Sequence, residues 1–379
     1  KLRFPGFDEP WSIYKAEELF KNVADKNHPM ETVLTIIQGK GTLPREQAGR
    51  NIHYDDASLA NYKKVEQGDF IIHLRSFEGG LEMANEDGIV SPAYTILRCK
   101  KPHSSLFYEA YFHTDEFINH ILSKSVEGIR DGRQISYEAF KWLGLPYCDV
   151  SEQERIAQLF CTLSHRIEKQ QQMVDALKKY KRGVVAAIFS HQLKFSDATG
   201  NPYPEWTSCT LQDAVDFLDG QRKPLESADR AKRQGQYPYY GASGIIDYID
   251  DFIFDEPLLL LGEDGANILN RSTPLCFIAE GKYWVNNHAH VMRPKAGQNI
   301  KFLCELLESL DYTRYNTGTA QPKLNQDKCR RIGLALPVYE EQCHIADFLS
   351  AFDQRTDKAQ SILDYLLSNR DGLLQQLFI

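Results

Sequence analysis

The sequence predicts an α+β protein: two β-rich globular units joined by a long antiparallel two-helix coiled coil, with an internal repeat that gives the chain a pseudo-two-fold relationship. Two observations support this prediction. The motif Glu-Gln-x-x-Ile-Ala occurs twice, and an unbroken heptad pattern follows each copy. Of the 379 residues, 42% are hydrophobic and 25% are charged, which is typical of globular domains.

The repeat extends over both halves of the chain. Glu152-Gln153 recurs as Glu341-Gln342, and Trp11 near the start of the chain matches Trp206 near the start of the second half. Self-similarity over such a distance indicates a duplicated structural unit. We therefore predict four segments: a globular unit at 1–145, a helical segment at 146–192, a second globular unit at 193–336 and a second helical segment at 337–379.

The helical segments carry a seam of residues spaced alternately by four and three positions, which is the signature of a coiled coil. Each helix of about 38 residues would be roughly 57 Å long. Nearly equal helices most simply pair with each other; the alternative, core helices of one large domain, is disfavoured by five uninterrupted heptads in each copy. The predicted seam comprises Ile156, Phe160, Leu163, Ile167, Val174, Leu177, Ile345, Leu349, Phe352, Leu363, Leu366 and Leu373.

The globular segments contain short apolar runs punctuated by glycine, which predict β-strands with a few helices, such as 115–125 and 299–310. The longest dense apolar run, Pro257 to Gly262, is far too short to cross a bilayer. Eight cysteines occur singly, without a C-x-x-C pair. We therefore expect free thiols, no zinc site, no membrane association and a cytoplasmic location.

Catalytic motifs are missing from the sequence: it has no phosphate-binding G-x-x-x-x-G-K-[ST] loop, no G-x-S-x-G elbow and no H-E-x-x-H. A metal-dependent nuclease site could combine Asp264 with Glu280 and Lys282, but the sequence around Asp264 is also typical of a tight turn. His288 and His290 have the spacing of paired metal ligands on a strand, but no third ligand is evident, so a structural or DNA-facing role is favoured for these histidines. We expect no catalytic residue and no metal ligand.

Several motifs resemble the specificity subunit (S, or HsdS) of Type I restriction–modification systems. The first unit carries looser versions, such as Gly68-Asp69. In the second unit the motifs are Tyr237-Pro-Tyr-Tyr-Gly-Ala-Ser-Gly, Leu261-Gly-Glu-Asp-Gly-Ala, Asn286-Asn-His-Ala-His and Gly318-Thr-Ala-Gln-Pro-Lys-Leu-Asn.

The resemblance implies that each globular unit is a target recognition domain that reads one half of a bipartite site in double-stranded DNA. It implies that the coiled coil sets the spacing between the half-sites and docks two methyltransferase (M) subunits, with restriction (R) subunits added to that core. S-adenosylmethionine, ATP and Mg²⁺ are then expected in the partner subunits, and this chain is expected to bind no cofactor. The alternatives are a stand-alone enzyme that cleaves or modifies DNA, and a coiled-coil scaffold without DNA specificity.

Base reading in the major groove uses amide, guanidinium, ammonium, imidazole and hydroxyl groups. The net charge of −8 means that any phosphate contacts require local clusters of basic residues or help from partner subunits. Candidate DNA-binding residues in the first unit are Gln38, Lys40, Arg45, Arg75, Ser76, Arg133 and Gln134. Those in the second unit are Gln221, Arg222, Lys223, Tyr239, Tyr240, Ser243, Asn286, Asn287, His288, Gln321 and Lys323.

Overall fold

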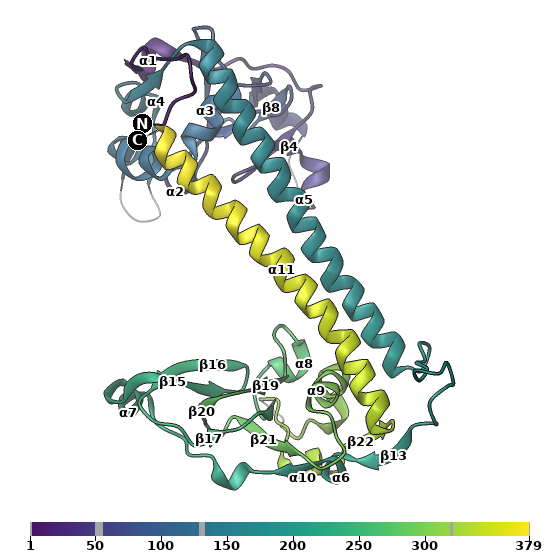
Figure 1. Ribbon diagram of the computed structural model, residues 1–379. Helices are drawn as coiled ribbons and strands as arrows, with labels where there is room; N and C mark the ends of the chain where they lie inside the picture. The colour runs from purple at the N-terminus through teal and green to yellow at the C-terminus, as the bar shows by residue number, and fades with distance from the viewer. Residues whose placement is uncertain (1, 50–55, 129–132, 319–320, 379) are drawn as a thin grey trace. The chain divides into compact units, whose positions relative to one another are not determined.

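The computed structural model describes residues 2–49, 56–128, 133–318 and 321–378. The chain divides into two compact units: unit 1 contains residues 1–172 and 360–379, and unit 2 contains residues 173–359. Each unit combines helices with mainly antiparallel sheets (Figure 1), and the one parallel pairing between named strands of the described residues joins β15 to β20 in unit 2. The mixed α and β character predicted from the sequence is confirmed.

Unit 1 is built around a four-stranded antiparallel sheet in the order β2-β9-β6-β7. Its strands are β2 (Phe20–Val23), β6 (Phe70–Ile72), β7 (Glu82–Met83) and β9 (Thr95–Cys99). Four two-stranded pairings or ribbons involve β1 (Ser12–Lys15) with β12 (Gly144–Tyr147), β3 (Leu34–Ile37) with β4 (Gly41–Pro44), β5 (Lys63–Val65) with β8 (Gly88–Val90), and β10 (Val126–Glu127) with β11 (Gln134–Ile135). Its short helices are α1 (Ala16–Leu19), α2 (Ser76–Gly79), α3 (Ser105–Phe112) and α4 (Tyr137–Phe140).

Unit 2 repeats the central sheet, with the order β14-β21-β18-β19 and the same antiparallel pairing. These strands are β14 (Val215–Phe217), β18 (Leu258–Gly262), β19 (Cys276–Ala279) and β21 (Ala289–Pro294). A ribbon of β13 (Thr207–Thr210) and β22 (Gly333–Leu336) corresponds to the β1-β12 ribbon. A second sheet, β16-β15-β20-β17, contains β15 (Gln234–Gly241), β16 (Gly244–Ile249), β17 (Phe254–Asp255) and β20 (Lys282–Val285). The helices are α6 (Leu211–Ala214), α7 (Ser227–Lys232), α8 (Asn267–Asn270), α9 (Ile300–Ser309) and α10 (Gln326–Arg330).

The duplication is also visible in how the first helix of each unit begins. In unit 1, the Glu18 carboxylate accepts a hydrogen bond from the backbone N–H of Lys15 at the start of α1. In unit 2, the Asp213 carboxylate accepts one from the backbone N–H of Thr210 at the start of α6. Both contacts satisfy a backbone donor that the first turn of a helix leaves free. The same local solution therefore occurs at the same place in two units whose sequences have diverged.

Two 40-residue helices, α5 (Val150–Phe189) and α11 (Tyr339–Phe378), each contribute to both units (Figure 1). In unit 1 the start of α5 and the end of α11 share one core, where the rings of Phe160 and Phe378 stack with centroids 6.3 Å apart. In unit 2 the end of α5 and the start of α11 share the core, through Ile188 and Ile345. Every residue of the predicted seam is buried or half-buried. Gln170 and Lys181 continue the alternating spacing of the seam and are also half-buried. Every other position along 161–183 that lies outside the seam is exposed. No helix among the described residues has the length and apolarity needed to cross a membrane.

Candidate nucleic-acid interface

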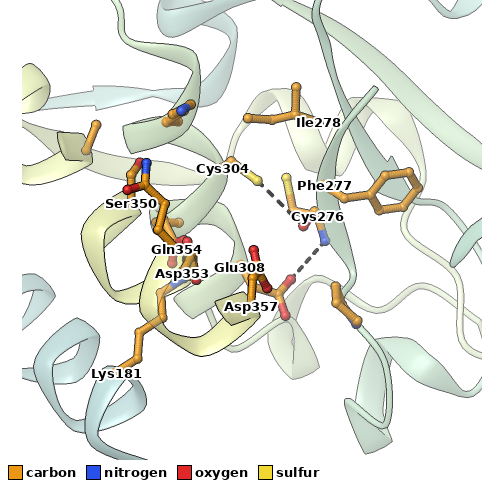
Figure 2. A pocket seen from close by; sticks show the side chains of 14 residues that line it. Lys181, Cys276, Phe277, Ile278, Cys304, Glu308, Ser350, Asp353, Gln354 and Asp357 are labelled. Carbon is orange, nitrogen blue, oxygen red and sulfur yellow. Dashed lines mark hydrogen bonds and ion pairs between the residues drawn. The ribbon is translucent and has the colours of Figure 1, made fainter. Parts of the chain in front are cut away.

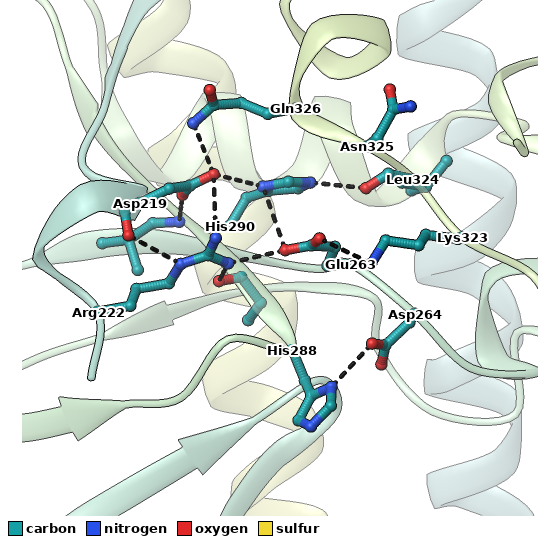
Figure 3. Close-up of polar contacts among 12 residues, drawn as sticks. Asp219, Arg222, Glu263, Asp264, His288, His290, Lys323, Leu324, Asn325 and Gln326 are labelled. Carbon is teal, nitrogen blue, oxygen red and sulfur yellow. Dashed lines mark hydrogen bonds and ion pairs between the residues drawn. The ribbon is translucent and has the colours of Figure 1, made fainter. Parts of the chain in front are cut away.

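In unit 2, four loop segments meet beside the central sheet in a network of charged side chains (Figure 3). His290, fully buried on β21, has Nδ1 2.7 Å from the Asp219 carboxylate and Nε2 2.8 Å from the backbone oxygen of Leu324. Both partners are pure acceptors, so both ring nitrogens donate and the imidazole is cationic. Burial lowers the pKa of His290, but the hydrogen bonds with Asp219 and Cys329 outweigh that effect and raise it to about 10.

Asp219 and Glu263 complete this network. Asp219 also accepts hydrogen bonds from the backbone N–H of Val291 and from the side chain of Gln326. Burial raises the pKa of Asp219, but these contacts, above all the one with His290, lower it below its ordinary value. Glu263 binds the Arg222 guanidinium at 2.8 Å and lies 3.3 Å from the Lys323 ammonium. Each buried charge therefore has an oppositely charged partner, as burial requires.

The exposed rim above this network carries His288 and Asp264. Their Nδ1 and carboxylate oxygen are 2.7 Å apart, and about half of the His288 side chain is exposed. The backbone of Asp264 pairs with that of Lys323 through an isolated β-bridge. Lys323 is also half-exposed, so the loop before β21, the turn after β18 and the Gln321–Gln326 segment together present polar groups on one rim. Thr319 and Ala320 of the predicted motif lie outside the described residues.

The structure corrects three of the unit 2 candidates. Tyr239 is 1% exposed and its hydroxyl accepts a hydrogen bond from the backbone N–H of Leu225. Asn286 is 4% exposed, and its side-chain oxygen accepts one from the backbone N–H of His288. Arg222 is turned inward to Glu263, so these three side chains support the loops and do not face a base. Tyr240 is half-buried, and the exposed candidates are Gln221, Lys223, Ser243, Asn287, His288, Gln321 and Lys323.

In unit 1 the predicted residues gather around the short helix α2. The Gln38 side chain lies so close to Gly79 that a Cβ there would overlap its amide nitrogen at 1.9 Å. The Arg133 guanidinium covers the Phe77 ring at 4.3 Å, and Arg75 is exposed at the start of the helix and pairs with Glu78. The first unit therefore has its own polar rim, formed by the tip of the β3-β4 hairpin, α2 and the segment around β11.

Ser76 is the correction in unit 1. It is fully buried and its hydroxyl accepts a hydrogen bond from the backbone N–H of His73, so it shapes the turn before α2 and cannot reach a base. Arg45 is half-buried near the Tyr62 ring, whereas Lys40 and Gln134 are exposed. The exposed side chains in both lists stay predicted DNA contacts.

Sequence reasoning missed the buried carboxylate–histidine pairs that hold both rims. In unit 1, the fully buried Glu82 side chain lies 3.3 Å from Nε2 of the half-buried His113. For His290 the sequence favours a structural or DNA-facing histidine over a metal ligand, but it does not indicate the Asp219 partner. On a regular strand His288 and His290 would share one face. His288 instead lies in the loop before β21, so its ring is half-exposed, whereas His290 lies on the strand and is buried. Their partners come from distant segments, which no local pattern reveals.

The strand register contradicts the nuclease alternative. Leu258 pairs with Ala279 and Leu261 pairs with Cys276, so Asp264 and Glu280 lie beyond opposite ends of the β18-β19 hairpin. Within the described ranges, no group of three or more His, Cys, Asp or Glu side chains could hold a metal ion. A pocket of about 450 Å³ between β19, α9 and α11 is likewise no reaction centre, because Lys181, Glu305, Glu308 and Asp353 in its wall already pair with protein groups (Figure 2).

The family model described as the Type I restriction modification DNA specificity domain matches residues 203–366. This segment contains the rim of unit 2 and most of α11. Residues 203–366 are therefore similar to type I specificity domains, and the match covers less than half of this chain. The resemblance recognised from the motifs is thereby confirmed.

Curated specificity subunits are similar over the same part of the chain. One from Haemophilus influenzae is 32% identical over 155 residues, which cover 41% of this chain and 38% of that protein. The EcoprrI specificity subunit of Escherichia coli is 28% identical over 154 residues, covering 40% of this chain and 37% of that protein. The match therefore spans less than two fifths of the length of these specificity subunits.

Solved structures extend the similarity of fold to the whole chain. The S subunit of a Type-I restriction-modification system from M. genitalium aligns with a TM-score of 0.63 at 15% identity, covering 100% of this chain and 98% of that one. A chain from a study of complex assembly and conformational transition of the type I R-M system aligns with a TM-score of 0.58 at 13% identity, covering 100% and 99%. At these identities the likeness concerns the fold alone, and that fold includes unit 1.

Proposed function

We propose that this chain is the DNA-specificity subunit of a type I restriction–modification complex. Each unit reads one half of a bipartite site in double-stranded DNA, through the rim at the edge of its central sheet. The observation that carries the proposal is the duplication: two units share one sheet order, and each has a separate polar rim. A single continuous site has no need of two such rims, whereas a split target does.

The proposal assigns α5 and α11 to an antiparallel coiled coil that sets the distance between the half-sites and docks two M subunits. The heptad seam, its burial and the pairing of opposite helix ends in each unit's core support this assignment. The chain itself performs no chemistry. S-adenosylmethionine belongs to the M subunits, while ATP and Mg²⁺ belong to partner subunits of the complete complex, which acts in the cytoplasm where the DNA is.

The test is base-modification sequencing of a genome in a host that expresses this chain with its M subunit. We expect one bipartite methylated motif, which disappears when this chain is left out. Replacement of residues 1–145 by the corresponding unit of another specificity subunit should change one half of the motif and leave the other half intact. A swap that altered both halves, or methylation independent of this chain, would contradict the proposal; the second result would favour a scaffold without DNA specificity.

A further inference from the structure

Each unit contains a buried carboxylate–histidine pair attached to the loops that carry exposed candidate base-reading side chains. The pairs occupy different places in the two units: Glu82 lies on β7, whereas His290 lies on β21. Their chemistry is the same, because in each pair both ring nitrogens of the histidine face pure acceptors. Since a buried charged pair is costly and often adds little stability, its presence beside both rims calls for another explanation.

In unit 1, the Glu82 carboxylate binds the backbone of the turn in the β3-β4 hairpin. Its two carboxylate oxygens accept hydrogen bonds from the backbone N–H groups of Gly39, at 2.7 Å, and Gly41, at 2.8 Å. Both glycines have positive φ values, 75° and 76°, which favour glycine and let the turn aim both N–H groups at one carboxylate. Lys40 lies between these glycines, so the backbone that carries its exposed side chain is held in place.

The side chain of Asn85 also binds the backbone of this turn. The Asn85 side-chain amide donates to the backbone oxygens of Lys40, at 2.8 Å, and Thr42, at 2.9 Å. The His113 ring bridges Glu82 and the backbone oxygen of Glu109, and so ties the carboxylate to the end of α3. The turn is therefore attached to the core of the unit through its backbone, while the side chains of Gln38 and Lys40 stay exposed.

In unit 2, the Asp219–His290 pair holds the Gln321–Gln326 segment in the same manner. His290 reaches the backbone oxygen of Leu324, and Asp219 binds the side chain of Gln326 (Figure 3). The Leu324 backbone N–H donates to the backbone oxygen of Glu263, at 2.7 Å, which joins this segment to the turn that carries Asp264. The exposed Lys323 and the His288–Asp264 pair thus depend on one buried network for their relative positions.

We propose that Glu82 in unit 1 and the Asp219–His290 pair in unit 2 are positioning residues for base recognition, each for the half-site read by its own unit. The inference rests on the proposed function. Hydrogen bonds to base edges discriminate only when donors and acceptors are aligned to within a fraction of an ångström, and a held backbone provides that alignment before DNA arrives. A loosened loop still contacts phosphates, because those contacts tolerate movement, but it reads bases poorly.

The experiment compares Glu82→Gln and His290→Gln in this chain, each co-expressed with the M subunit, by methylome sequencing. Asp69→Asn and Glu308→Gln serve as matched controls. Each removes the charge of a carboxylate that accepts backbone hydrogen bonds in the same unit but does not hold a candidate loop. The readout is the ratio of methylation at cognate sites to methylation at sites with one altered base, position by position in each half of the motif.

We expect Glu82→Gln to lower that ratio about tenfold in the first half-site and leave the second unchanged, and His290→Gln to do the reverse. The controls should lower only the total amount of methylation, and every position of the motif should stay as specific as in the wild type. A loss of stability reduces the amount of active complex on the DNA but does not alter the motif. If Glu82→Gln yields no complex, Asn85→Ala carries the test of unit 1, because it frees the same turn from an exposed side chain. Gln326→Ala is the corresponding variant for unit 2, because it frees the Gln321–Gln326 segment from Asp219 without changing a fully buried side chain.

Two results would overturn the inference: loss of methylation with both halves of the motif as sharply defined as in the wild type, or equal degeneracy in both halves from one variant. Failure of the proposed function is distinguishable from either, because the wild-type complex would then show no bipartite motif that depends on this chain.

Discussion

The Arg3 guanidinium forms two hydrogen bonds with the Glu152 carboxylate, at 2.5 and 2.9 Å, and so ties the start of the chain to the first turn of α5. Trp11 donates a third hydrogen bond to the same carboxylate. In the repeat, Glu341 takes the place of Glu152 and Trp206 remains its hydrogen-bond donor. Lys194 is the residue of the second repeat that corresponds to Arg3, but its ammonium group pairs with the exposed Glu205. Within the described residues, one oxygen of Glu341 is buried without a hydrogen-bond partner.

This asymmetry predicts opposite effects of the same substitution. Glu152→Gln should destabilise unit 1 by about 2–3 kcal/mol, because it leaves the half-buried Arg3 without its counter-charge. Glu341→Gln should be neutral or stabilise unit 2, because it removes a buried charge that forms no ion pair with a Lys or Arg side chain among the described residues. Hydrogen exchange of peptides from each unit measures the two effects separately. Equal losses in both variants would contradict this interpretation of the repeat.

Glu341 also predicts a pH dependence. Burial raises its pKa, and the hydrogen bond from Trp206 only partly opposes the shift. A carboxyl group whose pKa is raised on folding stabilises the folded state below the pKa of the unfolded chain, and this contribution disappears as pH rises through the folded value. Wild-type unit 2 should therefore gain stability relative to Glu341→Gln when pH is lowered from 7 toward 5. Hydrogen exchange at several pH values, corrected for the intrinsic rate, tests this.

His290 predicts a change at the opposite end of the pH scale. Its pKa of about 10 lies above the ordinary value of 6.5, so its stabilising contribution is complete below pH 6.5 and is lost as pH rises through 10. His290→Gln should cost about 2 kcal/mol at pH 6, because the buried Asp219 loses the nearer of its two cations and keeps only Arg222, 3.6 Å away. The difference from the wild type should shrink steadily by pH 10. Urea unfolding of both proteins across this range measures it, and a difference independent of pH would show that the imidazole is not charged.

Lys181 occupies a seam position of α5 and binds two carboxylates, Glu305 at 2.6 Å and Asp353 at 2.7 Å (Figure 2). Lys181→Met should lower stability by about 1–3 kcal/mol, because two neighbouring acids lose the cation between them and repel each other. The double variant Lys181→Met with Asp353→Leu should recover most of that loss, because it removes the repulsion and makes the seam apolar. A double variant as unstable as the single one would show that packing, and not charge, decides this position. Thermal unfolding is the measurement.

The last prediction concerns the spacing between half-sites. One heptad inserted after Gln172 in α5 and one after Ala359 in α11, where the two units divide these helices, should lengthen each by about 10.5 Å and keep the seam in register. The gap in the methylated motif should then grow by about 3 base pairs, with both half-sites unchanged. Four-residue insertions at the same points break the heptad register and serve as the control. An unchanged gap in an active complex would show that the helices do not set the spacing.

The sequence by itself determined the features that repeat along the chain. The heptad spacing requires two long helices with one apolar seam, because a period of 3.5 residues keeps that seam on one face, and α5 and α11 carry it from end to end. The duplicated Glu-Gln motif predicted two equivalent units, and the matching sheet orders agree with that duplication. Short apolar runs bounded by glycine predicted some strands of the central sheets, such as β18 in the run from Pro257 to Gly262.

Only the tertiary structure decided which polar side chains face outward. Ser76, Tyr239 and Asn286 have the chemistry of base-reading groups, but each satisfies a backbone N–H group inside its unit. Glu82 and His290 resemble ordinary surface residues in the sequence, but they are buried with partners 31 to 71 positions away. Hydrogen bonding inside a fold depends on which segments meet, and long-range contacts of this kind leave no periodic trace in the order of the residues.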